Sequence, residues 1–297
     1  MKQKQKEYFG MIGLIMVTII WGGGFVASDL ALETFSPFQI MAVRFFIAAV
    51  CMTAMGLKEI KTITKEEIKC GCILGTALFA GFALQIVGLQ YTTPSKNAFL
   101  TATNVVIVPF IALVIYKKKI ETRSIIGACM AIIGAGLLSL NADFSMGIGD
   151  ILTLFCAVGF AFQIFLTGEY VDKIRPTVLN FLQMTTAFVL SIAGCMVEGA
   201  KVHPGGKSIL AVLYLGLVST TVTYLLQTVS QKYVEETKAA IILSMEAVFG
   251  TIFSILLLHE NVTIKMIVGS ALIFGAVLVS ELRFSKKEEA GQKVCEE

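Results

Sequence analysis

The sequence predicts an all-α integral membrane protein with ten transmembrane helices, arranged as two inverted five-helix repeats. Three observations predict this fold class: the composition, ten apolar segments of membrane-spanning length, and the placement of Lys and Arg. Of the 297 residues, 56% are hydrophobic and 15% are charged, whereas a soluble domain carries about 25% charged residues because water must wet its surface. The composition therefore excludes a soluble enzyme and the disordered, collagen-like and disulfide-scaffold classes.

The ten apolar segments lie between clusters of charged and turn-forming residues. Each has about 18–25 residues, enough for a helix to cross the hydrocarbon core. Apolar residues fill consecutive positions, whereas the strands of a membrane barrel alternate apolar and polar residues. The first segment is too long for the apolar region of a signal peptide. The predicted spans are 9–31, 38–57, 68–90, 95–116, 123–140, 147–170, 176–198, 208–231, 237–258 and 264–282.

Lys and Arg gather on one side of the predicted membrane. Nineteen of the 24 lie in the loops and termini of one side, four lie on the other side, and Arg44 alone falls within a span. Because cytoplasmic loops of membrane proteins are enriched in Lys and Arg, both termini are expected in the cytoplasm. The chain is expected to be a multi-pass protein of the plasma membrane.

The two halves of the chain resemble each other. A shift of 142 along the chain carries a segment that starts at Leu84 onto one that starts at Leu226, and a shift of 139 places Pro37 on Pro176. The halves thus differ by a three-residue indel, which is expected in one loop. Since each repeat has an odd number of spans, the second copy enters the membrane from the opposite side. The predicted units are a first repeat over 1–140, a second repeat over 141–285 and a cytoplasmic tail over 286–297.

Glu246 is the deepest ionisable residue. It lies eight residues after Lys238 and thirteen before His259, or about 12 Å and 20 Å from the two faces at 1.5 Å per residue. A charge at such depth costs roughly 2.5–3.5 kcal/mol on insertion scales and so marks a functional site. Glu246 is therefore a candidate to bind a cationic substrate group or to carry a proton. The alternative is a neutral or paired Glu that ties helices together.

Arg44 lies seven residues after Pro37, about 10 Å deep in the second span. Three interpretations stay open for it. The side chain could extend back to the membrane surface, it could bind a substrate carboxylate with its guanidinium fork, or it could pair with a carboxylate such as Glu246.

Neutral polar residues recur at matching places in the two halves. Asn104 matches Glu246, Gln85 matches Gln227, and Gln183 matches Arg44. Such pairs suit a cavity between inverted repeats, and the alternative is interhelical hydrogen bonding. Trp21 lies at mid-span and suits a cavity wall better than an interface belt. The predicted substrate-binding residues are Trp21, Arg44, Gln85, Asn104, Gln163 and Glu246, with Glu246 also predicted to couple protons.

Helix irregularities are expected at two places. Gly22 to Gly24 permit either close helix approach or local unwinding, and Pro109 is expected to kink the fourth span because it lacks a backbone N–H.

The sequence predicts no cofactor, metal site or disulfide. None of the seven cysteines forms a Cys-x-x-Cys pair, and neither His lies at membrane depth. The chain is therefore not expected to be an enzyme, and it shows no nucleotide-binding motif and no nucleic-acid patch. The expected partners are the lipid bilayer, a small-molecule substrate and protons, and the expected assembly is a monomer or a weak homodimer.

Several stretches, in order along the chain, resemble the EamA family of the drug/metabolite transporter superfamily. They are Trp21-Gly-Gly-Gly-Phe25, Arg44-Phe-Phe, the run from Gln85 to Ala98, Leu243-Ser-Met-Glu246-Ala-Val-Phe and Leu257-Leu-His-Glu260. The family usually has Glu-Pro in the ninth span, where this chain has Glu246-Ala. The resemblance implies ten helices, a central cavity and export of small metabolites such as amino acids.

The expected function is that of a secondary exporter of amino acids or related amines and organic solutes, which works by alternating access and is coupled to protons. The first alternative is an exchanger or facilitator for sugar phosphates or nucleotide sugars, which would need more than one buried cation. The alternative of another class is a membrane sensor or scaffold that does not transport.

Overall fold

The computed structural model describes residues 3–117, 122–139, 146–198, 205–234, 239 and 242–281. These residues form helices and short connections, which confirms the all-α fold class. The helices are α1 (Gln3–Leu32), α2 (Pro37–Ile60), α3 (Lys65–Leu89), α4 (Pro94–Ala102), α5 (Asn104–Tyr116), α6 (Thr122–Ser139), α7 (Ile148–Tyr170), α8 (Pro176–Glu198), α9 (Gly206–Gly216), the π-helix η1 (Leu217–Val222), α10 (Thr223–Gln231), α12 (Glu246–Leu258) and α13 (Ile264–Glu281). The predicted boundary at 140/141 and the predicted tail over 286–297 lie outside the described residues.

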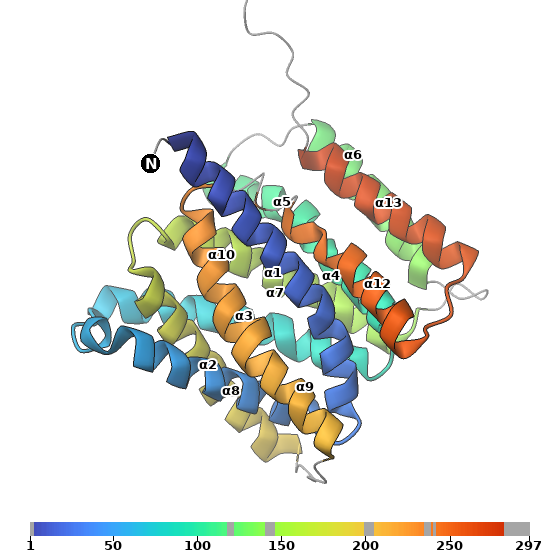
Figure 1. Cartoon of the computed structure of the whole chain (residues 1–297). Coiled ribbons are helices and arrows are strands. Elements are labelled where there is room, and N and C mark those ends of the chain that lie inside the picture. Colours follow the sequence, from blue (N-terminus) through green and yellow to red (C-terminus); the bar gives the residue numbers. More distant parts are fainter. Residues whose placement is uncertain are drawn as a thin grey trace, which may run out of the picture.

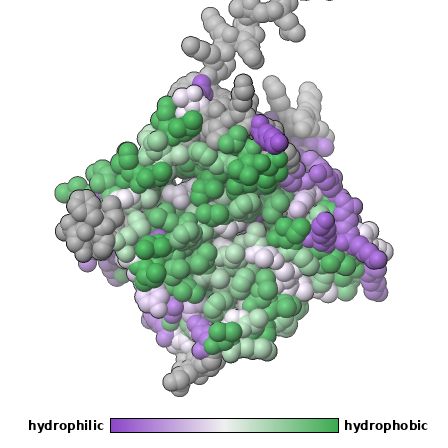
Figure 2. Space-filling view, turned by 180° about the vertical axis from the view of Figure 1, so that it is seen from behind, coloured by the Kyte–Doolittle hydropathy of each residue, from purple (hydrophilic) through white to green (hydrophobic). Residues whose placement is uncertain are grey.

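Among the described residues, seven helical segments are long and apolar enough to cross a membrane. They are α1, α2, α3, α4 with α5, α7, α8, and α9 continued through η1 and α10. Three shorter apolar helices lie within α6, α12 with the turn before it, and α13. Figure 2 shows that apolar residues cover most of one side of the molecule, with hydrophilic residues gathered at its edges. Water cannot wet such a surface, and the protein is therefore a multi-pass membrane protein.

Local sequence sets where several helices begin. Ser36 caps α2 in a reciprocal pair with Gln39, and Thr64 caps α3 in the same way with Glu67. These capping boxes satisfy backbone N–H groups that have no partner within the helix. Pro94 occupies the first turn of α4, where its missing N–H costs nothing.

Two helices are interrupted at the middle of a predicted span. Thr103 separates α4 from α5, and Met245 precedes α12; both accept short i→i+3 hydrogen bonds, from the N–H of Val106 (3.1 Å) and of Val248 (3.0 Å). The shift that carries Leu84 onto Leu226 also carries Thr103 onto Met245. Pro109 lies inside α5, so the irregular step in this span is at Thr103 rather than at the proline.

The same shift relates the later helices of the two halves. Lys117 and His259, which follow α5 and α12, are the non-glycine residues with positive φ among those described, at 55° and 53°. The helices α6 and α13 each have 18 residues, and the shift places both the first and the last residue of α6 on those of α13. The local backbone therefore repeats in detail.

The π-helix η1 contains one extra residue. The N-caps of α3 and α9, Thr64 and Gly205, are related by a shift of 141, whereas the C-caps of α3 and α10, Gln90 and Lys232, are related by a shift of 142. A π-helix accommodates an added residue within a continuous helix. The expectation that one loop holds the whole three-residue difference between the halves is therefore wrong, because one of the three residues lies in a helix.

Helices of one half pack on helices of the other. In Figure 1, α6 lies beside α13 at one edge, and α1 crosses the front between α12 and the α9–α10 helix; α2 packs on α8, and α3 packs on α7 and α8. Glycines allow the closest crossings: a Cβ on Gly159 would lie 2.7 Å from the backbone N of Gly81, and a Cβ on Gly22 would lie 2.5 Å from the Cβ of Phe249. Because α1 stays helical through Gly22, the glycines serve close approach and not unwinding.

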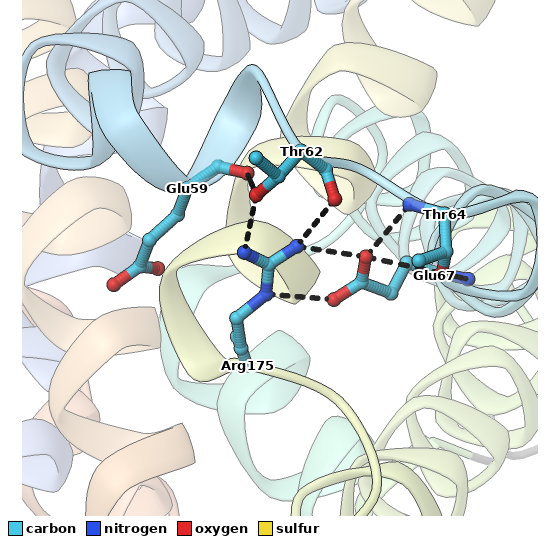
Figure 3. Close-up of polar contacts among 5 residues, drawn as sticks. All are labelled: Glu59, Thr62, Thr64, Glu67 and Arg175. Carbon is cyan, nitrogen blue, oxygen red and sulfur yellow. Dashed lines mark hydrogen bonds and ion pairs between the residues drawn. The ribbon is translucent and has the colours of Figure 1, made fainter.

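An ion pair joins the start of α3 to the α7–α8 connection on the face where α1 begins, here called the N-terminal face. Arg175, in the connection between α7 and α8, donates from Nε and one terminal nitrogen to the two carboxylate oxygens of Glu67, both at 2.9 Å. Its other hydrogen bonds reach the hydroxyl and carbonyl of Thr62, and Glu67 also accepts from the backbone N–H of Thr64 (Figure 3). On the opposite face, the hydroxyl of Ser208 at the start of α9 donates to the carbonyl of Leu30.

Replacing Arg175 with Ala is expected to lower the thermal unfolding midpoint in detergent without abolishing transport. The guanidinium of Arg175 holds the start of α3 to the α7–α8 connection, just as Ser208 holds the corresponding start of α9 to α1 on the other face. Because both contacts tie helix ends together away from the cavity, we expect the Arg175–Glu67 pair to stabilise the fold. Arg175→Lys, which keeps the charge but loses the two-pronged geometry, is expected to recover part of the midpoint. Loss of transport at an unchanged midpoint would contradict a scaffold role.

Candidate functional site in the central cavity

A cavity of about 50 Å³ lies at the centre of the helix bundle. Helices of both halves contribute to its wall, namely α1, α2, α3, α4, α5, α7, α9, η1, α10 and α12. This volume is below the range of small-molecule sites, so a solute would enter the cavity only as the surrounding helices move apart. The structure brings all six predicted residues to this one cavity: Trp21, Arg44, Gln85, Asn104, Gln163 and Glu246.

Arg44 is buried, with 2% of its surface exposed. Its Nε donates to the hydroxyl of Thr220 at 3.0 Å, and its guanidinium carbon lies 4.1 Å from the centre of the Phe82 ring, in cation–π contact. The side chain therefore does not extend back to the membrane surface. Within the described part of the chain it has no carboxylate at ion-pair distance, so the interpretation that Arg44 pairs with a carboxylate such as Glu246 does not hold in this structure. The third interpretation, binding of a substrate carboxylate, is not tested by this geometry and stays a prediction.

Glu246 is the first residue of α12 after the interruption at Met245, and 8% of its surface is exposed. It makes no hydrogen bond or ion pair with any side chain in the described ranges. The free N–H groups at the start of a helix favour a negative charge there. The interruption thus places a carboxylate against the cavity and leaves it available to a ligand.

Asn104 occupies the matching position as the first residue of α5. It is buried, and its Oδ1 has no hydrogen-bond partner within the described residues. A buried carbonyl oxygen without a partner costs free energy, so a donor from a ligand or a water would stabilise it. The two interrupted helices therefore present an amide and a carboxylate to the same cavity.

The other predicted residues are held in place by neighbouring hydroxyl groups. Gln85 donates to Thr101 at 3.1 Å, and Gln163 donates to Thr167 at 3.1 Å. Each amide keeps its carbonyl oxygen available to accept a hydrogen bond. These contacts orient the side chains that line the cavity.

Trp21 is fixed by the segment that contains the π-helix. Its indole N–H donates to the carbonyl of Ser219 at 3.1 Å and to the hydroxyl of Thr223 at 2.9 Å, and its ring packs 5.2 Å from that of Tyr224. The indole therefore presents a rigid apolar face, as expected for a cavity wall.

The sequence interpretation did not identify three aromatic residues that line the cavity. Phe82 packs edge-on against Phe160 at 5.0 Å and lies 6.4 Å from Tyr224, and all three line the cavity. Phe and Tyr are common in membrane helices, so their identity gave no signal. The internal repeat did contain a signal for two of them, since the shift that carries Gln85 onto Gln227 also carries Phe82 onto Tyr224.

Two residues that the repeat singled out do not line the cavity. Gln183 and Gln227, which match Arg44 and Gln85, are fully buried and do not line the cavity. Among the described residues, no group of three or more His, Cys, Asp or Glu side chains could hold a metal ion. The cavity is lined by one guanidinium, one carboxylate, amides, aromatic rings and the hydroxyls of Ser28, Thr101 and Ser219.

Comparison with known proteins supplies the family. The model of the EamA-like transporter family matches twice, over residues 8–140 and 147–282. The chain belongs to the EamA-like transporter family. The chain is therefore a membrane transporter and not an enzyme, in agreement with the interpretation of its sequence.

The relatives of this EamA-like protein are also named as transporters. An uncharacterized transporter of Archaeoglobus fulgidus is 36% identical over 94% of this chain and 87% of its own length. The uncharacterized transporter YoaV of Bacillus subtilis is 25% identical over 94% and 98%. The uncharacterized inner membrane transporter YedA of Escherichia coli is 26% identical over 73% and 74%.

A solved crystal structure shares the fold of this EamA-like chain. The two superpose with a TM-score of 0.69 over 91% of this chain and 96% of the other, at 16% identity. The likeness supports the arrangement of helices described above.

Proposed function

We propose that this EamA-like protein is a secondary active exporter of amino acids or related amines and organic solutes, which works by alternating access and is coupled to protons. One observation carries the proposal. A buried guanidinium and a buried carboxylate, neither paired with an opposite charge among the described residues, line the same cavity.

A zwitterion complements this pair of charges. The carboxylate of an amino acid would accept two parallel hydrogen bonds from the terminal nitrogens of Arg44, whose Nε is occupied by Thr220. The ammonium group would lie at Glu246. A substrate with both groups would neutralise both buried charges, which favours it over a solute with a single charge. The Phe82, Phe160 and Tyr224 rings would then contact its apolar part.

A phosphate-bearing substrate suits the cavity less well. Arg44 is the one cation among the described residues that line it, whereas a doubly charged phosphate calls for more than one positive partner. The neighbouring Glu246 would also repel it.

Inverted repeats support the alternating-access part of the proposal. The family model matches each half of the chain, and the interruptions, the positive-φ residues and the last helices repeat at one common shift along the chain. The helix contacts agree. The contact of α1 with α12 corresponds to that of α7 with α5, and the contact of α1 with α9 and α10 corresponds to that of α7 with α3. With five spans in each copy, the two halves have opposite orientations, and the substrate site lies where they meet.

The placement of Lys and Arg supports a plasma-membrane transporter with both termini in the cytoplasm. In this orientation the N-terminal face, with Arg175 and Glu67, is cytoplasmic.

Counterflow in proteoliposomes tests the proposal. Vesicles loaded in turn with unlabelled L-amino acids, biogenic amines and sugar phosphates are diluted into a trace of the labelled solute, after a thermal-shift screen of the same panel. We expect zwitterionic amino acids to raise the unfolding midpoint and to exchange, and an imposed pH gradient to drive their accumulation. Exchange of sugar phosphates alone would favour the exchanger, and stabilisation without any flux would favour a sensor.

A further inference from the structure

A second cluster of polar side chains lies buried between α8 and α10, outside the cavity. It consists of Asn180 and Gln183 on α8 and Gln227, Thr228 and Gln231 on α10, each at most 7% exposed. Asn180 links the two helices, since its amide N–H donates to Thr228 at 2.9 Å and its carbonyl accepts from Gln183 at 2.6 Å. We call these five residues the amide cluster.

Five polar atoms of the amide cluster have no hydrogen-bond partner in the part of the chain that the structure describes. They are Oε1 of Gln183 and both Oε1 and Nε2 of Gln227 and of Gln231. Buried amides are normally satisfied by protein or water, and leaving them unmet costs free energy. Leu at these positions would avoid this cost, so the three glutamines are candidates to meet water or a polar solute.

The repeat relates the amide cluster to the cavity. The counterparts of Gln183, Gln227, Thr228 and Gln231 in the first half are Arg44, Gln85, Ile86 and Leu89, and all four line the cavity. Other residues that the repeat relates line the cavity in both halves. These pairs are Trp21 and Phe160, Gly24 and Gln163, Phe25 and Ile164, Phe82 and Tyr224, and Asn104 and Glu246. Both halves therefore contribute equivalent residues to the central part of the cavity. Beyond this part, the cavity extends toward the face opposite the N-terminus and not toward the N-terminal face.

We infer that the amide cluster is a second solute subsite, which lines an extension of the cavity toward the N-terminal face when the two halves exchange conformations. This inference rests on the proposed alternating access. The subsite takes uncharged hydrogen-bonding groups and water, because it contains amides and a hydroxyl where the other extension has a guanidinium. The end of α10, at Gln231, packs near the start of α1, where the backbone of Ser230 lies beside Gly10. The cluster thus leads from the centre toward that face.

Thiol labelling of matched positions tests the subsite. Gln227→Cys and its counterpart Gln85→Cys are made separately in the full chain with its seven native cysteines replaced by Ser or Ala. A membrane-impermeant methanethiosulfonate carrying a quaternary ammonium is applied to each face of oriented vesicles. We expect Gln227→Cys to react from the N-terminal face and not from the other, and Gln85→Cys to react from the opposite face only. Labelling of Gln85→Cys without labelling of Gln227→Cys from either face would overturn the subsite.

A failure of alternating access itself is recognised by counterflow, which would then be absent for every solute, whereas labelling of Gln85→Cys alone in a protein that does exchange solute counts against the subsite. A second measurement uses the chain with its native cysteines. Gln227→Leu removes two unmet polar atoms and is expected to raise the unfolding midpoint by about 2–4 °C while it slows counterflow of the exchanged amino acid. A lower midpoint for Gln227→Leu would show that the amide is satisfied in the resting protein, and would count against the inference. Gln85→Leu, which loses the bond to Thr101, is the matched control and is expected to lower the midpoint.

Discussion

Replacing Glu246 with Gln is expected to abolish proton-driven accumulation of substrate while the protein stays folded. The carboxyl lies buried at the first position of α12, faces the cavity and has no partner among the described residues. Gln keeps the size and hydrogen-bonding capacity of the side chain but cannot take up or release a proton. Loss of a charge-assisted contact with the substrate ammonium is also expected to weaken binding about 10- to 100-fold. Accumulation driven by a pH jump in proteoliposomes measures the effect.

Asn104→Ala is the matched control for Glu246→Gln, because Asn104 occupies the corresponding position at the start of α5. It is expected to weaken binding but to leave the response to the pH gradient intact. Glu246→Asp, which can still titrate, should retain part of the driven flux. If Glu246→Gln keeps full pH-dependent flux, the proposed proton coupling through this residue is wrong.

Replacing Arg44 with Ala is expected to raise the half-saturating concentration of a transported amino acid about 10- to 100-fold, the loss expected for a charge-assisted hydrogen bond. The corresponding amine, which lacks the carboxylate, should lose much less. Counterflow with the two solutes side by side measures this difference. It separates loss of a carboxylate contact from general damage to the cavity.

Two further variants define how Arg44 acts. Arg44→Lys keeps the charge but loses the planar fork and its stacking on Phe82, and is expected to be intermediate. Thr220→Val removes the acceptor that orients the guanidinium and should affect the amino acid more than the amine. Equal losses for both solutes in Arg44→Ala would mean that the residue holds the helices and does not bind the substrate.

The sequence allowed the prediction that polar residues at membrane depth lie together inside the helix bundle, because each of them must avoid lipid. All six predicted residues line one cavity, and the reason is physical: a guanidinium or carboxylate in a span has few other places to lie. The aromatic residues around them could not be identified in the same way. Phe82 or Tyr224 would be equally stable facing lipid, a neighbouring helix or the cavity, and only the packed structure distinguishes these positions.

The repeat predicted positions better than environments. It correctly related Asn104 to Glu246, and both line the cavity. It also related Gln227 to Gln85 and Gln183 to Arg44, but one member of each of these pairs is buried elsewhere. Sequence similarity between repeats relates positions in the fold. In a single conformation, two related positions can still have different environments, one in the cavity and one buried between helices. The interruptions at Thr103 and Met245 carried no composition signal either, since no glycine or proline occupies those positions.

The extra residue in η1 has a thermodynamic consequence. Two halves of identical structure would give two end states of equal free energy, and an empty transporter would populate both equally. In this chain the hydroxyls of Thr220 and Thr221 bond to carbonyls five residues earlier, and no such winding exists in α3. Under the proposed alternating access, the two end states are therefore expected to differ in free energy, with the resting population biased toward one of them before any substrate binds. Deleting one residue from η1 would change that bias without touching a charged group.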